Sequence, residues 1–183
     1  IEEIARLIGY DKFESFLPDP IKPGILNPEQ KVHRDINILM TSVGFQEVTT
    51  MSLVSELEGK IPLSNPLLKE TSYLRQNLWN EHLNVCERNI KNGIKDVWIF
   101  ELGNIYNEQL VQENKIETRS VLGGMICGKK RLEKWTIDKN EKTLNYYEAR
   151  GLLKQVLDFL KLNVEDKTLN SDPILHPGRS ANL

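Results

Sequence analysis

The sequence alternates helix-like and strand-like segments, and its strand-like segments follow one another too closely for regular βαβ units. Strand patterns rich in β-branched and apolar residues occupy 45–54, 97–106 and 116–128. Antiparallel strands can be joined by short connections, whereas parallel strands need long crossovers. We therefore predict an α+β fold with a mostly antiparallel sheet and helices on one of its faces.

Clear start and stop signals mark the first long helix. Asn27 is a typical N-cap, Pro28 suits the first helical position, and Gln30 completes a capping box. Gly44 ends this helix. Apolar residues at helical spacing predict its buried face, which comprises Val32, Ile36, Leu39 and Val43.

Two further helices are predicted at 77–92 and 146–162. The inward faces expected for them are Trp79, Leu83, Cys86 and Ile90 in the first, and Ala149, Leu152, Val156, Phe159 and Leu160 in the second. The polar run 107–115 between two strand patterns is predicted to be a connector.

The N-terminal part differs in character from the rest of the chain. Residues 1–8 resemble the end of a helix that Gly9 stops, and 11–28 carry four prolines, which favours an extended connector. We predict that 1–26 are the end of a preceding helical domain plus a connector, and that 27–183 form one module. The chain begins without methionine, so we expect an internal fragment of a longer protein.

Charge and cysteine content exclude some classes of function. The net charge of −2 and the pI of about 6.0 give no global attraction to nucleic acid, so RNA contact would need a local basic patch. The run KKR at 129–131 beside Trp135 is such a candidate, although nearby acidic residues favour a solvated loop. Cys86 and Cys127 lack CxxC spacing and are predicted to be small core residues in a reducing setting. No run of 18 apolar residues predicts a membrane span.

The segment VWIFELGNIYNEQ at 97–109 predicts a buried strand that ends in a polar turn after Gly103. Glu101 is the unexpected residue, because a charged group in a buried strand needs a partner.

Other candidate sites are weaker. The three histidines, His33, His82 and His176, share no metal-ligand spacing, which favours structural roles. Glu2 and Glu3 can complement a helix N-terminus or coordinate a hard cation, and residue types alone favour the former. In HPGR at 176–179, Arg179 can bind an anion or belong to a tight turn.

Five segments in order, IEEIARLIGYD, VGFQEV, SNPLLKETSYLRQNL, IFELGNIY and HPGRSA, resemble the β subunits of bacterial phenylalanyl-tRNA synthetases over essentially the whole chain. The resemblance implies a class II aminoacyl-tRNA synthetase-like module, an antiparallel sheet flanked by helices. In that family the α subunit activates phenylalanine with ATP, and the β copy is degenerate. Asn107 occupies the position at which active class II enzymes carry a phosphate-binding arginine, and Glu101 is expected to be bonded inside the module.

The resemblance also implies a metal and partners. Glu2 and Glu3 match half of a Mg²⁺ site shared with the α subunit. The expected role is a non-catalytic scaffold of a cytoplasmic heterotetrameric ligase that uses ATP and tRNAPhe. The competing hypothesis is a competent class II ligase. It requires another arginine beside the strand at 97–106, and Arg75, Arg88 and Arg119 are the candidates.

Overall fold

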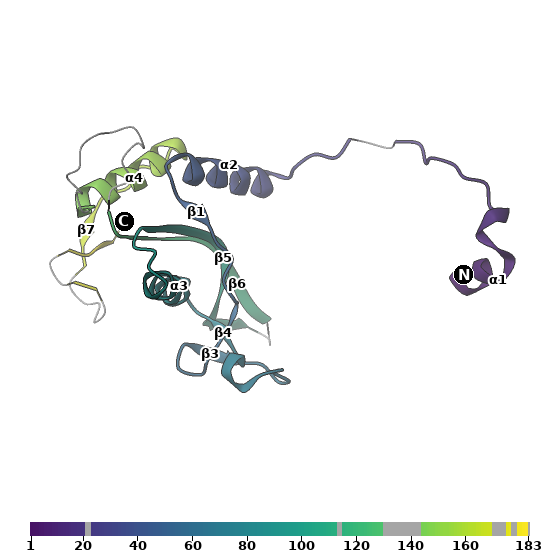
Figure 1. The fold of residues 1–183 in the computed structure, drawn as a ribbon, viewed down its shortest axis with the longest axis horizontal. Helices are drawn as coiled ribbons and strands as arrows, with labels where there is room; N and C mark the ends of the chain where they lie inside the picture. Colours follow the sequence, from purple (N-terminus) through teal and green to yellow (C-terminus); the bar gives the residue numbers. More distant parts are fainter. Residues whose placement is uncertain (21–22, 113–114, 130–143, 170–174, 177–178, 183) are drawn as a thin grey trace. The chain divides into compact units, whose positions relative to one another are not determined.

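The computed structural model describes residues 1–20, 23–112, 115–129, 144–169, 175–176 and 179–182. It divides into two units, Ile1–Lys31 and Val32–Leu183, and the boundary falls in the first turn of the long helix α2 (Pro28–Ser42). The backbone is shown in Figure 1.

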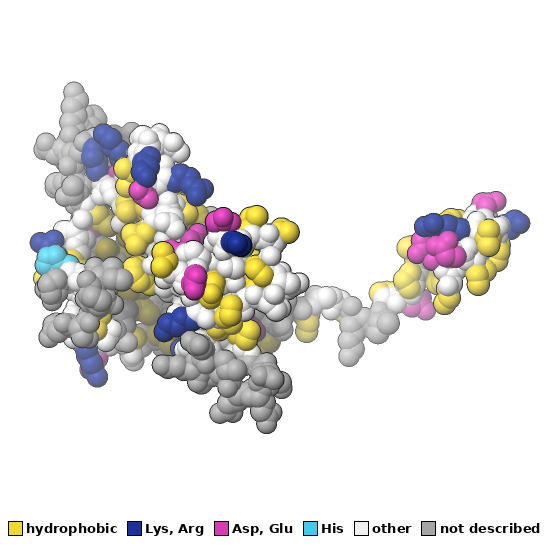
Figure 2. Space-filling view, turned by 90° about the horizontal axis from the view of Figure 1, so that it is seen from below, with side chains coloured by type: hydrophobic (Ala, Val, Ile, Leu, Met, Phe, Trp, Pro, Cys, Tyr) yellow, Lys and Arg dark blue, Asp and Glu magenta, His cyan; other side chains and the backbone are white. Residues whose placement is uncertain are grey.

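The first unit contains helix α1 (Glu2–Ile8) and the 3-10 turn η1 (Tyr10–Lys12), followed by an extended segment. Gly9 ends α1 with a φ of 94°, as the sequence predicts. None of the seven residues of α1, all of them described, is buried. Hydrophobic side chains lie exposed around this helix beside its acidic and basic ones (Figure 2).

The second unit is built around the antiparallel hairpin of β5 (Val97–Gln112) and β6 (Lys115–Cys127). Strand β1 (Gln46–Glu47) pairs with β5 in parallel, so this sheet has the order β1-β5-β6 and is mixed. The α+β class is confirmed. The polar turn expected after Gly103 is wrong, because 103–107 continue the strand and pair with 117–121. The connector expected at 107–115 is likewise largely strand.

A second small sheet has the order β2-β4-β3, with β2 (Leu53–Val54), β3 (Gly59–Pro62) and β4 (Tyr73–Arg75). The 3-10 turn η2 (Lys69–Thr71) precedes β4. The single strand expected at 45–54 is wrong, since this segment supplies β1 to one sheet and β2 to the other. Near the C-terminal end, β7 (Lys167–Thr168) pairs with β8 (Ala181–Asn182).

Helices cover both faces of the β5–β6 hairpin rather than one, which corrects the sequence-based expectation (Figure 1). Helices α2 and α4 (Tyr146–Phe159) pack on one face, against Trp98 and Phe100. Helix α3 (Trp79–Lys91) packs on the opposite face, against Val97 and Ile99. Because successive side chains of a strand point to opposite faces, four consecutive apolar residues are buried here.

The helix start signals are confirmed, and all three predicted helix faces need correction. In α2, the predicted inward residue Val32 is 48% exposed, whereas Ile36 is buried. In α2, the Asn27 side chain accepts from the Gln30 backbone N–H at 2.8 Å, and Gln30 accepts from the Asn27 N–H at 3.0 Å. The residues of α3 that are buried are His82 and Cys86, whereas three of the four predicted inward residues, Trp79, Leu83 and Ile90, are exposed. In α4, Val156 is buried as predicted but Phe159 is exposed.

The two glycines at 123 and 124 occupy different environments. A Cβ on Gly123 would lie 3.1 Å from both Leu78 and His82, so the start of α3 approaches β6 closely there. A Cβ on Gly124 would make only ordinary contacts with Phe45 and Met40. Among the described residues, no helix is both long and apolar enough to cross a membrane.

Candidate functional site

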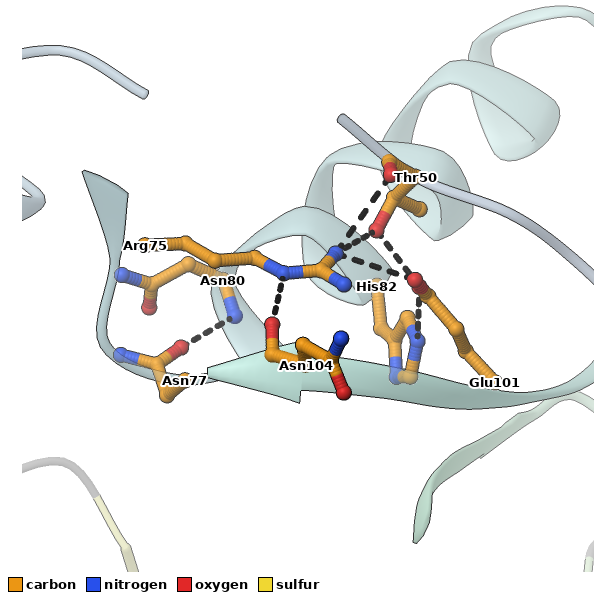
Figure 3. Close-up of polar contacts among 7 residues, drawn as sticks. All are labelled: Thr50, Arg75, Asn77, Asn80, His82, Glu101 and Asn104. Carbon is orange, nitrogen blue, oxygen red and sulfur yellow. Dashed lines mark hydrogen bonds and ion pairs between the residues drawn. The ribbon is translucent and has the colours of Figure 1, made fainter. Parts of the chain in front are cut away.

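A buried ion pair joins the two sheets (Figure 3). The Arg75 guanidinium, at the end of β4, lies with its Nη1 3.0 Å from Oε1 of Glu101 on β5. Each side chain is only 3–4% exposed. Burying a charge is costly unless it is paired and hydrogen-bonded, so these two residues depend on each other.

Neighbouring polar groups complete the hydrogen bonding of the pair. Arg75 Nε donates to the Asn104 carbonyl oxygen at 2.8 Å, and Nη1 donates to the Thr50 hydroxyl at 2.8 Å. The Thr50 hydroxyl in turn donates to Oε2 of Glu101 at 2.5 Å. His82 Nε2 lies 3.4 Å from the same carboxylate oxygen and is 1% exposed. We call these five residues, Thr50, Arg75, His82, Glu101 and Asn104, the Arg75–Glu101 cluster.

Local sequence explains how each element delivers its side chain. Glu101 follows Val97 and Ile99 at a period of two, so it points to the face of β5 that α3 covers. The Asn77 side chain accepts the backbone N–H of Asn80 at 3.1 Å and stabilises the start of α3, one turn before His82. Thr50 lies in the segment between β1 and β2, where the chain passes from one sheet to the other.

The cluster shifts two pKa values. Burial alone would raise the pKa of the Glu101 carboxyl, but the Thr50 hydrogen bond and the Arg75 charge outweigh burial and lower this pKa below its usual 4.5. Burial lowers the pKa of His82 below 6.5, and the adjacent Glu101 carboxylate only partly opposes that shift. At neutral pH the cluster therefore holds one cation, one anion and a neutral imidazole.

These shifts predict that the protein loses stability in acid. Unfolded His82 takes up a proton near pH 6.5 while folded His82 does not, so the free energy of unfolding should fall as pH drops below 6.5. Glu101 adds a second loss below pH 4.5, because its folded pKa is the lower one. Urea titrations from pH 8 to 5 should show a shallower slope for His82→Gln. His176→Gln, at an exposed residue, is the control, and equal slopes for all three proteins would contradict the assignment.

The cluster accounts for one of the three candidate arginines. Arg75 does lie beside β5, but its guanidinium is buried and paired with Glu101 instead of facing a ligand. Arg88 and Arg119 are exposed. Arg119, on β6, lies opposite Ile105 of β5, so an exposed candidate arginine does lie beside this strand. The prediction that Glu101 is bonded inside the module is confirmed, whereas the contribution of Thr50 and His82 was not predicted.

Comparison with known proteins assigns the family. Residues 14–183 match the family model described as the phenylalanyl tRNA synthetase beta chain CLM domain. The chain belongs to the phenylalanyl-tRNA synthetase β-chain family. Proteins named phenylalanine–tRNA ligase β subunit are 50% identical in Prochlorococcus marinus, 49% in Parasynechococcus marenigrum and 48% in a Synechococcus species, each match covering 100% of this chain. The chain spans only 22–23% of the length of these relatives.

The remaining candidate residues of this β-chain module are dispersed. Glu2 and Glu3 lie in the first turn of α1, with Arg6 Nη2 3.0 Å from Glu2 and Nη1 3.8 Å from Glu3. Asn107 is exposed on β5 opposite Glu117. Among the described residues, no three His, Cys, Asp or Glu side chains form a metal-binding group.

The two basic motifs are only partly described. Of KKR at 129–131, the structure describes Lys129, whose backbone N–H donates to Asp96 at 2.8 Å, and 130–131 and Trp135 lie outside the described residues. Of HPGR at 176–179, the structure describes His176 and Arg179, and 177–178 lie outside the described residues. The Arg179 backbone N–H donates to the His176 carbonyl oxygen at 3.0 Å. Arg179 also lines an open cavity of about 720 Å³ together with Tyr146, Tyr147, Asp166, Thr168 and Ser180.

Proposed function

We propose that this chain is a non-catalytic scaffold module in the β subunit of a phenylalanine–tRNA ligase. The observation that carries the proposal is the Arg75–Glu101 ion pair, since Arg75 is a candidate arginine beside β5 and it is buried and paired internally. A guanidinium that is buried and paired with a carboxylate does not present its charge to a nucleotide phosphate. Asn107, at the matched position, has no fixed charge to replace it.

The fold proposed for the module is that of class II aminoacyl-tRNA synthetases. The long antiparallel hairpin β5–β6 with helices on both faces supports this assignment. We propose further that 27–183 constitute the catalytic-like module and that 1–26 belong to the end of a preceding helical domain plus a connector. No residue of α1 is buried, which supports a helix whose packing partners belong to another domain.

The activity of the whole enzyme is proposed from the family. An αβ complex, a heterotetramer in the cytoplasm, would attach phenylalanine to tRNAPhe, with ATP used by the α subunit. Helix α2 and the edge of the sheet are the surfaces proposed to face that subunit. Val32 and Ile38 on α2 are 48% and 59% exposed, which leaves apolar surface available for a partner.

A Mg²⁺ site shared with the α subunit remains a proposal for Glu2 and Glu3. Their carboxylates are exposed and adjacent, and carboxylate oxygens suit this hard cation, so the pair fits half of a site. Arg6 competes for both carboxylates, and the remaining ligands would have to come from outside the described part of this chain.

The test is adenylate formation, measured as phenylalanine-dependent ATP–pyrophosphate exchange. We expect the 183-residue chain, folded by circular dichroism, to give no exchange above the level without protein, while a holoenzyme assembled with the α subunit gives robust exchange. Phenylalanine-dependent exchange by the chain above that level would overturn the scaffold proposal and favour the competent ligase.

A further inference from the structure

The Glu101 carboxylate is surrounded by hydrogen-bonding groups from three separate parts of the chain. The Arg75 guanidinium approaches Oε1 at 3.0 Å, and the Thr50 hydroxyl donates to Oε2 at 2.5 Å. His82 Nε2 lies 3.4 Å from Oε2. These groups belong to β4, to the segment between β1 and β2, and to α3, and they converge on one carboxylate (Figure 3).

Arg75 and His82 are also held by contacts that do not involve Glu101. Arg75 Nε donates to the Asn104 carbonyl oxygen at 2.8 Å, and Nη1 donates to the Thr50 hydroxyl oxygen at 2.8 Å. His82 projects from α3 against β6, where a Cβ on Gly123 would lie 3.1 Å from its Cε1. Groups that their neighbours hold in place are preorganised, so a bound anion does not have to order them.

The carboxylate is enclosed as well as hydrogen-bonded. A Cβ on Gly103 would lie 2.8 Å from Oε1 of Glu101 and 3.1 Å from Leu78 Cδ2, so these residues close one side. The Glu101 side chain is 4% exposed. Shortening it would leave a small buried cavity with the Arg75 charge on its wall. Water can fill such a cavity and form hydrogen bonds, but it cannot neutralise a buried cation.

We propose that Thr50, Arg75 and His82 form an anion-binding pocket for a small planar carboxylate, and that the chain fills this pocket with its own Glu101 side chain. Glu101 acts as a built-in ligand that keeps other anions from Arg75. The inference does not depend on the ligase assignment, since it uses only the geometry of the Arg75–Glu101 cluster.

The length to which Glu101 is shortened determines which free carboxylate fits. Glu101→Ala removes Cγ and the carboxylate, which correspond to the heavy atoms of acetate. Glu101→Gly removes Cβ as well, and the missing atoms then correspond to propionate. Engineered cavities inside proteins admit small molecules of matching shape, whereas a larger molecule must displace packed atoms. Acetate should therefore bind Glu101→Ala better than propionate does, and propionate should gain on acetate in Glu101→Gly.

The experiment measures thermal unfolding of the 183-residue chain at pH 7 by circular dichroism, with acetate replacing chloride at constant ionic strength. Glu101→Ala should unfold at a lower temperature than the unsubstituted protein, because Arg75 loses its buried counter-charge. About 100 mM acetate should raise the unfolding temperature of this variant by about 5 °C or more, as a ligand with a dissociation constant of about 1 mM would. Acetamide, which has a similar shape and no charge, should give no rise.

Matched variants locate the bound anion. Glu101→Gln keeps the volume of the side chain, leaves no cavity and should not respond to acetate. Adding Arg75→Met to Glu101→Ala removes the cation and should abolish the response. If Glu101→Ala is unfolded in buffer, the titration is made in sucrose, which favours the compact state.

Several results would overturn the proposal. Glu101→Ala might be stabilised equally by acetate and acetamide, or not at all by acetate, and in either case the pocket does not select an anion. A response to acetate that persists without Arg75 would place the anion elsewhere. An equal response of the unsubstituted protein would show that Glu101 does not occupy the site, and a variant that stays unfolded in sucrose with acetate would show that acetate cannot replace its carboxylate.

Discussion

Replacing Arg75 with methionine should lower the free energy of unfolding by about 3–5 kcal/mol. Methionine fills much of the volume of the arginine stem but leaves the Glu101 carboxylate, 4% exposed, without its counter-charge. It also leaves the Asn104 carbonyl oxygen without its donor at 2.8 Å and the Thr50 hydroxyl with one partner fewer. Urea unfolding at pH 7, monitored by circular dichroism, measures the loss.

Two further variants test the cause of this loss. Arg88→Met removes an exposed arginine and should change stability by less than about 0.5 kcal/mol. The double variant Arg75→Met with Glu101→Leu removes both charges and should recover much of the stability lost by Arg75→Met alone. A double variant as unstable as the sum of the two single variants would contradict a buried charge as the cause.

The sequence predicted those parts of the fold whose signals are local. Asn27 and Gln30 form the predicted capping box because each side chain bonds a backbone group three residues away. Gly9 and Gly44 end their helices with φ of 94° and 102°, a conformation that glycine adopts at no steric cost. Such signals act within one helical turn, so they can be recognised from the spacing of residues in the sequence.

The errors in the predicted fold arise where a distant segment decides the outcome. Residues 107–112 are mostly polar and were predicted to be a connector, but pairing of Asn107 with Glu117 and of Gln112 with Lys115 extends the hairpin through them. Residues 45–54 read as one strand, yet pairing with β5 and with β4 divides them between two sheets. In α3, the polar residue His82 is buried and lies opposite Glu101. A pattern of hydrophobic residues cannot predict the burial of a polar side chain that depends on such a partner.

The candidate site was predictable only in part for the same reason. Glu101 in an apolar strand indicated that a partner must exist, and this prediction is confirmed. The identity of the partner was not determined, because Arg75 lies on a strand of the other sheet. Thr50 gave no signal at all, since it lies inside the strand pattern at 45–54, where threonine is an ordinary residue.

Substituting Gly103 with alanine should lower the free energy of unfolding by about 2–3 kcal/mol, through crowding of the Arg75–Glu101 cluster. A Cβ at this position would lie 2.5 Å from Arg75 Nη2 and 2.8 Å from Glu101 Oε1, closer than real Cβ contacts. One of the paired groups must therefore move, and both are held by hydrogen bonds that the movement would lengthen.

Gly151→Ala is the matched control because it adds the same methyl group to the same residue type. A Cβ there meets no atom within 4 Å, and the position lies inside α4, so alanine should raise the free energy of unfolding by about 0.5–1 kcal/mol. The two substitutions should therefore have opposite signs in urea unfolding. If Gly103→Ala lowers the free energy of unfolding by no more than about 0.5 kcal/mol, as an ordinary surface substitution does, the cluster accommodates the methyl group and the crowding argument is contradicted.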